Sequence, residues 1–226
     1  MPTTICESIA AIKKELAPFQ AKLVAVSKTH PQERLLEAYA CGQLIFGENR
    51  VQELASKAEA LPTDIEWHFI GHLQRNKVKY IAPFVHMIHA VDSWRLLEEI
   101  DKRAAAENRT IKVLLQCKIA QEDSKYGLSA EDLDTLLTQH DWQALQNIQI
   151  CGLMGMATFT DDEAQVRREF QQLKHLFTQT KERFFTNDNR FTEISMGMSG
   201  DYPVALEEGS TMVRIGSKIF GHRDYA

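Results

Sequence analysis

Apolar and polar residues repeat with two different periods, and the two periods alternate along the whole chain. Residues 4–18 place Ile5, Ile9, Ile12 and Leu16 on one stripe, which predicts an amphipathic helix. Short apolar runs typical of buried strands then alternate with helical spacings. The predicted strands cover residues 22–27, 43–47, 66–71, 86–92, 110–119, 148–156, 191–197 and 211–216. The predicted helices cover residues 32–41, 48–61, 73–82, 93–108, 129–140, 161–184 and 201–209.

Two of the predicted helices begin with residues that favour a helix start. Ser93 is a good N-cap for the helix over 93–108. Ser129 and Asp132 have the spacing of a capping box, in its acidic variant, at the start of the helix over 129–140. These signals support the predicted order of elements.

Strict alternation of strands and helices predicts a parallel sheet. Eight such units within 226 residues favour a single α/β domain over residues 1–226, built as a (β/α)8 TIM barrel. The extra helix, within residues 1–20, is expected to pack on the barrel. A doubly wound open sheet is the alternative, because short strands are easily miscounted.

The composition is that of an ordinary globular protein, with 44% hydrophobic and 25% charged residues. The net charge is -5 and no basic tract is present, which argues against nucleic acid as a partner. The same negative balance argues against binding to anionic membranes. No apolar run approaches the roughly 20 residues that a membrane-spanning helix needs.

The cysteines are four in number and widely separated in the sequence, at Cys6, Cys41, Cys117 and Cys151. None forms a Cys-x-x-Cys pair, and the charged N-terminus does not resemble a signal peptide. The sequence therefore predicts a reduced, cytoplasmic protein with structural cysteines.

Most of the polar residues that need an explanation follow the predicted strands. In order, the ends of the predicted strands carry Lys28, residues 47–49, His68 with Gly71, Asp92, residues 123–127, Met154 with Met156, residues 195–201 and residues 214–217. In a (β/α)8 barrel the active site lies at the C-terminal ends of the strands. We therefore expect these residues to surround one mouth of the barrel.

Two of these segments have the composition of a phosphate site. Ser195, Ser199 and nearby glycines precede the predicted helix over 201–209, and Gly216 with Ser217 follows the last strand. Glycine allows close approach of the backbone, and backbone N–H groups at a helix start favour anions. Barrels frequently bind phosphate after strands seven and eight. Ordinary turn chemistry is the alternative explanation for each segment.

Lys28 ends a strand that is otherwise apolar, where an unpaired lysine is unusual. An amine in a dry site loses proton affinity and then forms a Schiff base with a carbonyl. A carbonyl ligand that also carries phosphate is either pyridoxal 5'-phosphate (PLP) or a sugar-phosphate aldehyde. Alternatively, Lys28 caps its strand and pairs with an acid such as Glu48 or Asp201.

Seven segments in order resemble the PLP homeostasis proteins, the YggS/PROSC family of PLP-binding proteins. The resemblance runs from about Leu23 to the C-terminus. It rests on AVSKTHP, FGENRVQE, WHFIGHLQRNK, DSKYGL, GLMGMA, SMGMSGDY and EEGSTMVRIGSKIFG. Each segment alone is weakly specific, but the ordered set is highly specific.

The resemblance implies a fold and a cofactor site. The fold is that of the alanine racemase N-terminal domain, called fold type III among PLP proteins. Lys28 matches the lysine that carries PLP as an internal aldimine, and Arg214 matches the arginine that faces the pyridine nitrogen. The remaining matches are the phosphate cradle, formed by Ser195, Ser199, Gly216 and Ser217, and two residues that line the cofactor, Asn49 and His68.

The resemblance also implies a function, which is to hold PLP and to deliver it to apo-enzymes. A cation beside the pyridine nitrogen disfavours its protonation and makes the ring a weaker electron sink. The alternative is an amino-acid racemase, which needs a second acid/base that alanine racemases take from a second domain. We expect this chain to lack that domain, so Tyr126 or Tyr202 would have to substitute. A carrier with at most weak racemase-like activity is therefore favoured.

Other interpretations receive less support. His68 with His72, or His86 with His89, has a ligand-like spacing, but the sequence favours structural histidines and no metal. An interaction module is a further alternative, and a monomer is the expected oligomeric state. Lys125 is a candidate second PLP-reactive or transfer lysine, although a solvated loop lysine is the simpler interpretation.

Overall fold

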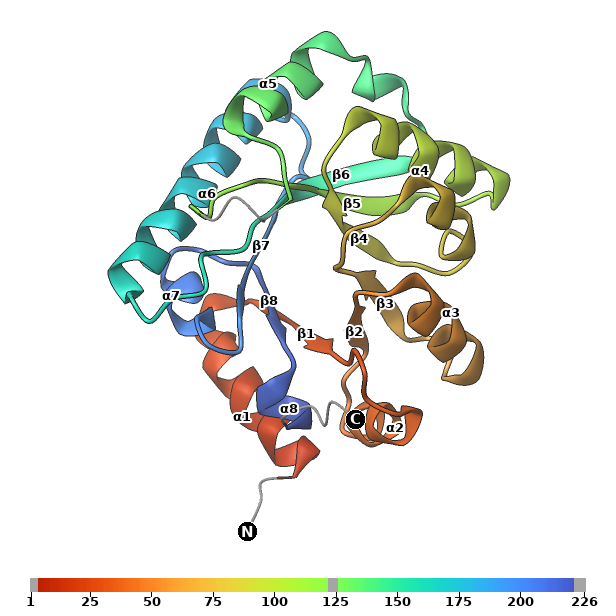
Figure 1. Cartoon of the computed structure of the whole chain (residues 1–226), viewed down its shortest axis with the longest axis vertical. Helices are drawn as coiled ribbons and strands as arrows, with labels where there is room; N and C mark the ends of the chain where they lie inside the picture. The colour runs from red at the N-terminus through yellow and green to blue at the C-terminus, as the bar shows by residue number, and fades with distance from the viewer. Residues whose placement is uncertain (1–3, 122–125, 222–226) are drawn as a thin grey trace.

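In the computed structural model, which describes residues 4–121 and 126–221, eight parallel strands close into a barrel (Figure 1). The first strand pairs with the last one, through partners such as Leu23 with Val213 and Ala25 with Ile215. This closure confirms the predicted (β/α)8 barrel. It excludes the doubly wound open sheet, whose first and last strands would not be hydrogen-bonded to each other.

All eight predicted strands are present, with somewhat different ends. They are β1 (Lys22–Val26), β2 (Ile45–Glu48), β3 (Glu66–Phe69), β4 (Met87–Val91), β5 (Ile111–Gln116), β6 (Ile148–Met154), β7 (Glu193–Met198) and β8 (Met212–Ile215). The α-helices are α1 (Ile5–Leu16), α2 (Gln32–Ala40), α3 (Val51–Ala60), α4 (Trp94–Ala106), α5 (Ala130–Gln139), α6 (Glu163–Phe184), α7 (Tyr202–Glu207) and α8 (Ser217–Phe220). Three 3-10 helices complete the described elements: η1 (Ala17–Phe19), η2 (Arg75–Tyr80) and η3 (Trp142–Ala144).

The leading helix α1 buries the predicted stripe of four apolar residues. A capping box between Thr4 and Glu7 begins the helix, because each side chain bonds a backbone N–H of the other. The helix lies outside the strands, against β1, α2 and α8 (Figure 1). The predicted capping box of Ser129 and Asp132 is also present at α5, whereas Ser93 precedes α4 without a side-chain capping bond.

One predicted helix has a different form. Residues 73–82 contain the 3-10 helix η2 rather than an α-helix. No side chain caps its first turn, and Pro83 follows soon after its end. A short segment that lacks an N-terminal cap and is followed by proline adopts the tighter hydrogen bonding of a 3-10 helix.

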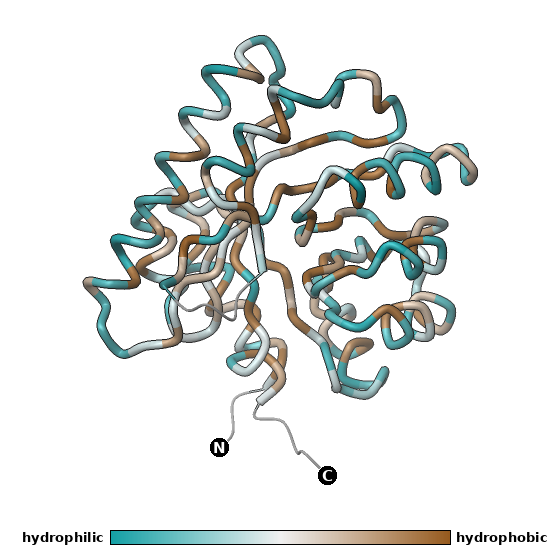
Figure 2. The backbone as a smooth tube through the Cα atoms, turned by 45° about the horizontal axis from the view of Figure 1, so that its top comes forward, coloured by the Kyte–Doolittle hydropathy of each residue, from teal (hydrophilic) through white to brown (hydrophobic). Residues whose placement is uncertain are grey.

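The core has an outer and an inner part. Along β1, Leu23 and Ala25 belong to the large cluster between strands and helices, whereas Val24 belongs to a smaller cluster within the ring of strands. Met87 and Leu114, on β4 and β5, are also in the smaller cluster. Apolar strands surrounded by helices with polar outer faces are visible in Figure 2. This inner cluster separates the two ends of the barrel.

The cysteines differ from expectation. Cys6 on α1 and Cys41 after α2 are joined in a disulfide, with their Cα atoms 5.5 Å apart. Cys117 and Cys151 are free and buried. The prediction of a fully reduced protein is therefore wrong for the first pair. Its error was to judge proximity from sequence separation, which α1 overcomes by packing on α2.

Among the helices of the described residues, none has the length and apolar character needed to cross a bilayer.

Candidate functional site

Five of the eight predicted site residues lie after the C-terminal ends of four neighbouring strands, whereas His68, Ser195 and Arg214 lie within strands. Lys28 follows β1, Asn49 follows β2, Ser199 follows β7, and Gly216 with Ser217 follows β8. These four strands are consecutive around the closed barrel, in the order β7, β8, β1 and β2. The parallel arrangement therefore brings all five residues to one mouth of the barrel.

A buried ion-pair network holds the backbone on the N-terminal side of Lys28. The ammonium group of Lys57, on α3, donates to the carbonyl oxygen of Ser27 at 2.8 Å and to Oε1 of Glu48 at 2.8 Å. The Ser27 hydroxyl donates to the same carboxylate oxygen at 2.6 Å. The side chains of Lys57 and Glu48 are only 6% and 0% exposed. Ser27 is therefore fixed through both its backbone and its side chain.

The same network holds the residue that follows Lys28. Thr29 has a φ of 68°, an unusual value for a β-branched residue. Its N–H donates to Oε1 of Glu53 at 2.5 Å, and Glu53 accepts a second bond from Lys57 at 2.7 Å. Backbone strain of this kind persists only where surrounding contacts impose it. Lys28 is thus positioned between two anchored neighbours.

The network gives Lys57 a structural role that differs from the role predicted for Lys28. Lys57 already bonds three oxygen acceptors, which is the full donor capacity of an ammonium group. Burial raises the pKa of the Glu48 carboxyl, while the charge of Lys57 lowers it. Glu48 accepts from both Lys57 and Ser27 through the same oxygen, Oε1.

Arg214, on β8, is buried within the barrel and is 4% exposed. Its guanidinium donates to the hydroxyl of Ser195 at 2.5 Å and to the carbonyl oxygen of Gly155 at 3.0 Å. Burial lowers the pKa of Arg214 to about 10, which leaves the group charged at neutral pH. A fixed positive charge therefore lies below the mouth that Lys28 borders.

Two histidines continue from Ser195 through the barrel. The Ser195 Oγ lies 3.0 Å from Nδ1 of His89, and Nε2 of His89 lies 2.9 Å from Nδ1 of His68. His68 lines a cavity together with residues from the N-terminal ends of the strands, such as Lys22 and Lys112. Of the eight predicted site residues, His68 is therefore the one placed farthest from the C-terminal mouth along this series. Ser195, which belongs to the first predicted phosphate segment, is bonded to Arg214 and His89.

The predicted phosphate segments after β7 and β8 are joined by one hydrogen bond. The N–H of Gly216 donates to Oγ of Ser199 at 3.2 Å. Gly216 also passes very close to β1, since a Cβ added there would lie 2.9 Å from the carbonyl oxygen of Val26. Ser217, the first residue of α8, is exposed. The two segments thus form one continuous rim beside β1.

Gly216→Ala is expected to destabilise the fold, because the new methyl group must displace backbone rather than a flexible side chain. Overpacking of this kind costs about 1–3 kcal/mol. Gly200→Ala, in the adjoining loop, is the matched control, since a Cβ there meets nothing within 4 Å. Urea unfolding of both variants is the measurement. Equal stabilities would show that the contact of Gly216 with Val26 is unimportant.

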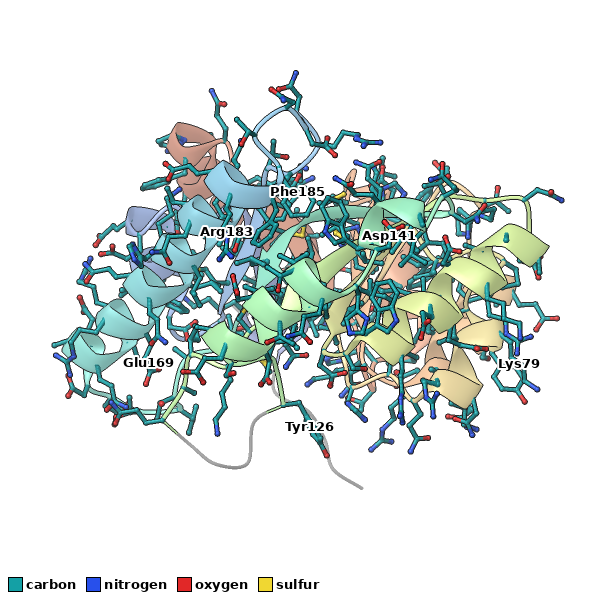
Figure 3. All side chains as sticks on the ribbon, turned by 90° about the horizontal axis from the view of Figure 1, so that it is seen from above. Lys79, Tyr126, Asp141, Glu169, Arg183 and Phe185 are labelled. Carbon is teal, nitrogen blue, oxygen red and sulfur yellow. A yellow bond between two sulfur atoms is a disulfide. The ribbon has the colours of Figure 1, made fainter. Side chains whose placement is uncertain are left out.

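The candidate second bases for racemisation lie in different surroundings. The Tyr202 hydroxyl bonds the carboxylate of Glu15 on α1, and burial first, then Glu15, raises its pKa to about 12. Tyr126 is exposed and stacks on His72, with ring centroids 4.3 Å apart. Figure 3 shows Tyr126 and Phe185 on opposite sides of the molecule. Lys125 lies outside the described residues.

Sequence reasoning did not identify the groups that position the predicted residues. Lys57 lies within the predicted helix over 48–61, and the sequence favours a structural role for His89 without naming its partners. The signal for both was present, since a lysine and a histidine occurred where apolar residues were expected. His68 and His72 do not share a site, because His68 is buried and His72 is exposed.

Comparison with known proteins places these features in a family. The family described as alanine racemase, N-terminal domain, matches residues 4–224. The pyridoxal phosphate homeostasis protein of Aquifex aeolicus is 42% identical over 206 residues, which covers 91% of this chain and 88% of that protein. The human pyridoxal phosphate homeostasis protein is 38% identical, and the match covers 97% of this chain and 83% of that protein.

Solved structures agree with this similarity. PipY of Synechococcus elongatus PCC7942, solved with PLP bound, superposes with a TM-score of 0.87 at 38% identity. The match covers 96% of this chain and 100% of the PipY chain. Alanine racemase from Bartonella henselae, solved with covalently bound PLP, has a TM-score of 0.71 at 14% identity. That match covers 96% of this chain but 58% of the racemase, and it supports the fold alone.

Proposed function

Since the chain belongs to the pyridoxal phosphate homeostasis proteins of the alanine racemase N-terminal domain family, we propose that it binds PLP and takes part in PLP homeostasis. The observation that carries this proposal is the anchoring of Lys28. A buried network fixes the residues on both sides of it, at a mouth that also carries Arg214 and the rim of Ser199 and Gly216. A PLP-bound relative at 38% identity supports the same assignment.

The residues at this mouth fit an aldehyde that carries phosphate. Lys28 supplies an amine, which forms a covalent bond with an aldehyde carbon. The rim of Ser199, Gly216 and Ser217 supplies hydroxyl and backbone donors of the kind that bind phosphate, and Gly216 leaves no room for a side chain against β1. Arg214 is assigned to the pyridine nitrogen, and Asn49 to the wall of the site. When bound, PLP supplies the electrophilic aldehyde and the aromatic ring.

The assignment of His68 as a residue that lines PLP is retained only as a prediction of the family resemblance. In this fold two residues, His89 and Ser195, connect His68 to Arg214. The effect of His68 on PLP is therefore proposed to be indirect. Ser195 is likewise proposed to act by orienting Arg214.

We propose that this protein holds PLP reversibly and delivers it to apo-enzymes, and that its racemase-like turnover is at most weak. Tyr202 is poorly suited to proton transfer, because its hydroxyl is bonded to Glu15 and its pKa is raised to about 12. A charged Arg214 beside the pyridine nitrogen makes the ring a weaker electron sink. Both features favour storage of the cofactor over rapid catalysis.

Titration of the purified protein with PLP tests the proposal. We expect one equivalent to bind with a near-visible absorbance band, and borohydride to abolish the band and leave a mass increase on the peptide that contains Lys28. Incubation with an apo-enzyme that needs PLP then measures delivery by recovery of that enzyme's activity. A protein that takes up no PLP refutes binding, whereas a stable complex that activates no apo-enzyme refutes delivery alone.

We further propose a monomer located in the cytoplasm. Light scattering of the purified protein tests the oligomeric state. In a reducing compartment the Cys6–Cys41 disulfide would be opened by cellular thiols. Alkylation in intact cells tests the location, since a cytoplasmic protein is expected to react at Cys6 and Cys41, and complete protection of both would contradict it.

A further inference from the structure

The N-terminal end of the barrel contains a second cavity, of about 490 Å³. It lies at the opposite end of the strands from Lys28. Its lining includes Lys22 and Lys112 from the starts of β1 and β5, and Glu193 from the start of β7. His68 reaches this cavity from β3. Nothing in the function proposed above uses this cavity.

The hydrogen bonds between Arg214 and His68 have a direction that follows from their donors. A guanidinium group only donates, so Ser195 accepts from Arg214, and the buried hydroxyl needs an acceptor for its own proton. The other partner of the Ser195 hydroxyl is Nδ1 of His89, which therefore accepts. A neutral His89 then carries its proton on Nε2 and donates it to Nδ1 of His68.

This direction determines the proton position on His68. Because Nδ1 accepts, a neutral His68 carries its proton on Nε2. Both histidines are neutral at pH 7, since burial lowers the pKa of each well below its usual value. Nε2 of His68 is buried and makes no hydrogen bond. The series that begins at Arg214 therefore ends in an unpaired, buried N–H donor on a side chain that lines the cavity.

The charges around this donor favour an anion. Of the three cations in the lining, Lys22 is paired with Glu193 and Arg190 with Asp188, whereas Lys112 has no carboxylate partner among the described residues. The ammonium group of Lys112 lies 3.2 Å from Nε2 of His86, and the same nitrogen lies 3.4 Å from Oε2 of Glu66. Burial lowers the pKa of His86 as well.

We propose that this cavity binds a small oxyanion of the size of phosphate, held by Nε2–H of His68 and the ammonium group of Lys112. The anion supplies the acceptor that the buried donor lacks, and it gives Lys112 an ionised partner in place of an imidazole. The site does not depend on PLP binding, because every contact in the argument lies within the protein.

A divalent metal is the competing occupant. Ligand atoms of Glu66, His68 and His86 lie within 4.8 Å of one another. A metal on Nε2 of His68 would need the lone pair of that nitrogen, so the proton would move to Nδ1 and the hydrogen bonds between the two histidines and Ser195 would reverse. The hydroxyl proton of Ser195 would then lose its acceptor within the barrel. It would also lie beside the Lys112 ammonium. Both consequences favour the anion.

The direct test is the position of the imidazole protons. Nitrogen-15 NMR of histidine-labelled wild-type protein is expected to show the Nε2–H form for both His68 and His89. Addition of inorganic phosphate is expected to shift the His68 Nε2–H signal in a saturable manner. An Nδ1–H form at His68, or a signal that phosphate leaves unchanged, overturns the proposal.

Two matched variants locate the binding. Lys112→Met removes the cation with little change in shape and is expected to weaken phosphate binding at His68 about tenfold, the loss of one charge-assisted hydrogen bond. Lys102→Met makes the same change at an exposed position of α4 and should leave the affinity unchanged. Stoichiometric zinc binding with reversal of the His68 tautomer would assign the cavity to a metal and refute the anion.

Discussion

Lys28→Ala is expected to abolish the near-visible absorbance band of the PLP-loaded protein and the mass increase that follows borohydride. The reason is chemical, because the alanine side chain has no amine to bond the aldehyde carbon. Lys57, the buried lysine nearest in the network, cannot replace it, since its three donors are engaged with Ser27, Glu48 and Glu53. Residual, non-covalent PLP binding through the rim of Ser199 and Gly216 is expected to remain.

Lys79→Ala is the control for this experiment. Lys79 belongs to η2 and is exposed, and Figure 3 shows it on the outer surface of the molecule. This variant should keep both the band and the mass increase. A Lys28→Ala protein with an unchanged band would assign the attachment to another lysine and contradict the role proposed for Lys28.

Lys57→Met is expected to lower the free energy of unfolding by about 3–5 kcal/mol, the usual cost of removing one partner from a buried ion pair. The variant leaves the carboxylate of Glu48 buried without its ammonium partner, and it frees the carbonyl of Ser27 and one bond of Glu53. Because these groups flank Lys28, PLP affinity should fall as well. Urea unfolding and PLP titration measure the two effects.

Two comparisons separate this explanation from a simple packing defect. Lys57→Met combined with Glu48→Gln should be more stable than Lys57→Met alone, because the fully buried carboxylate of Glu48 is no longer present. Lys102→Met, on the exposed face of α4, should unfold like the wild type. If the double variant is less stable than the single variant, the loss arises from packing rather than from the unpaired carboxylate.

The pH dependence of Lys57→Met has a defined sign. Burial already raises the pKa of Glu48, and the variant removes the charge that lowers it, so the pKa in the folded state rises further. A carboxyl group whose folded pKa exceeds its unfolded value of about 4.3 destabilises the fold once the pH passes that value. The deficit of the variant should therefore be smallest near pH 4.3 and grow towards neutral pH. A deficit that is independent of pH would contradict the assignment to Glu48.

The elements that could be predicted from the sequence are those whose residues interact locally. The stripe of α1 and the capping box of Ser129 with Asp132 involve residues three or four positions apart, and both are present as predicted. The eight strands were predicted from continuous apolar runs. Their alternation with helices implied parallel pairing, and parallel pairing placed Lys28, Asn49, Ser199 and Ser217 at one mouth.

The features that could not be predicted depend on the three-dimensional approach of distant residues. The bond between Arg214 and Ser195 joins adjacent strands, but its continuation through His89 to His68 crosses the barrel interior. The disulfide joins residues 35 positions apart because two helices pack together. No pattern in the amino-acid order encodes such contacts.

The sequence by itself determined the barrel and the residues at its C-terminal mouth, because strand order and side-chain alternation follow from local periodicity. Only the tertiary structure decided how Lys28 is positioned and where His68 lies. The buried charge of Lys57 needs the oxygen atoms of three residues around it. The position of the proton on His68 depends on Arg214, which is connected to His68 through Ser195 and His89. Only closure of the barrel brings these four side chains into contact.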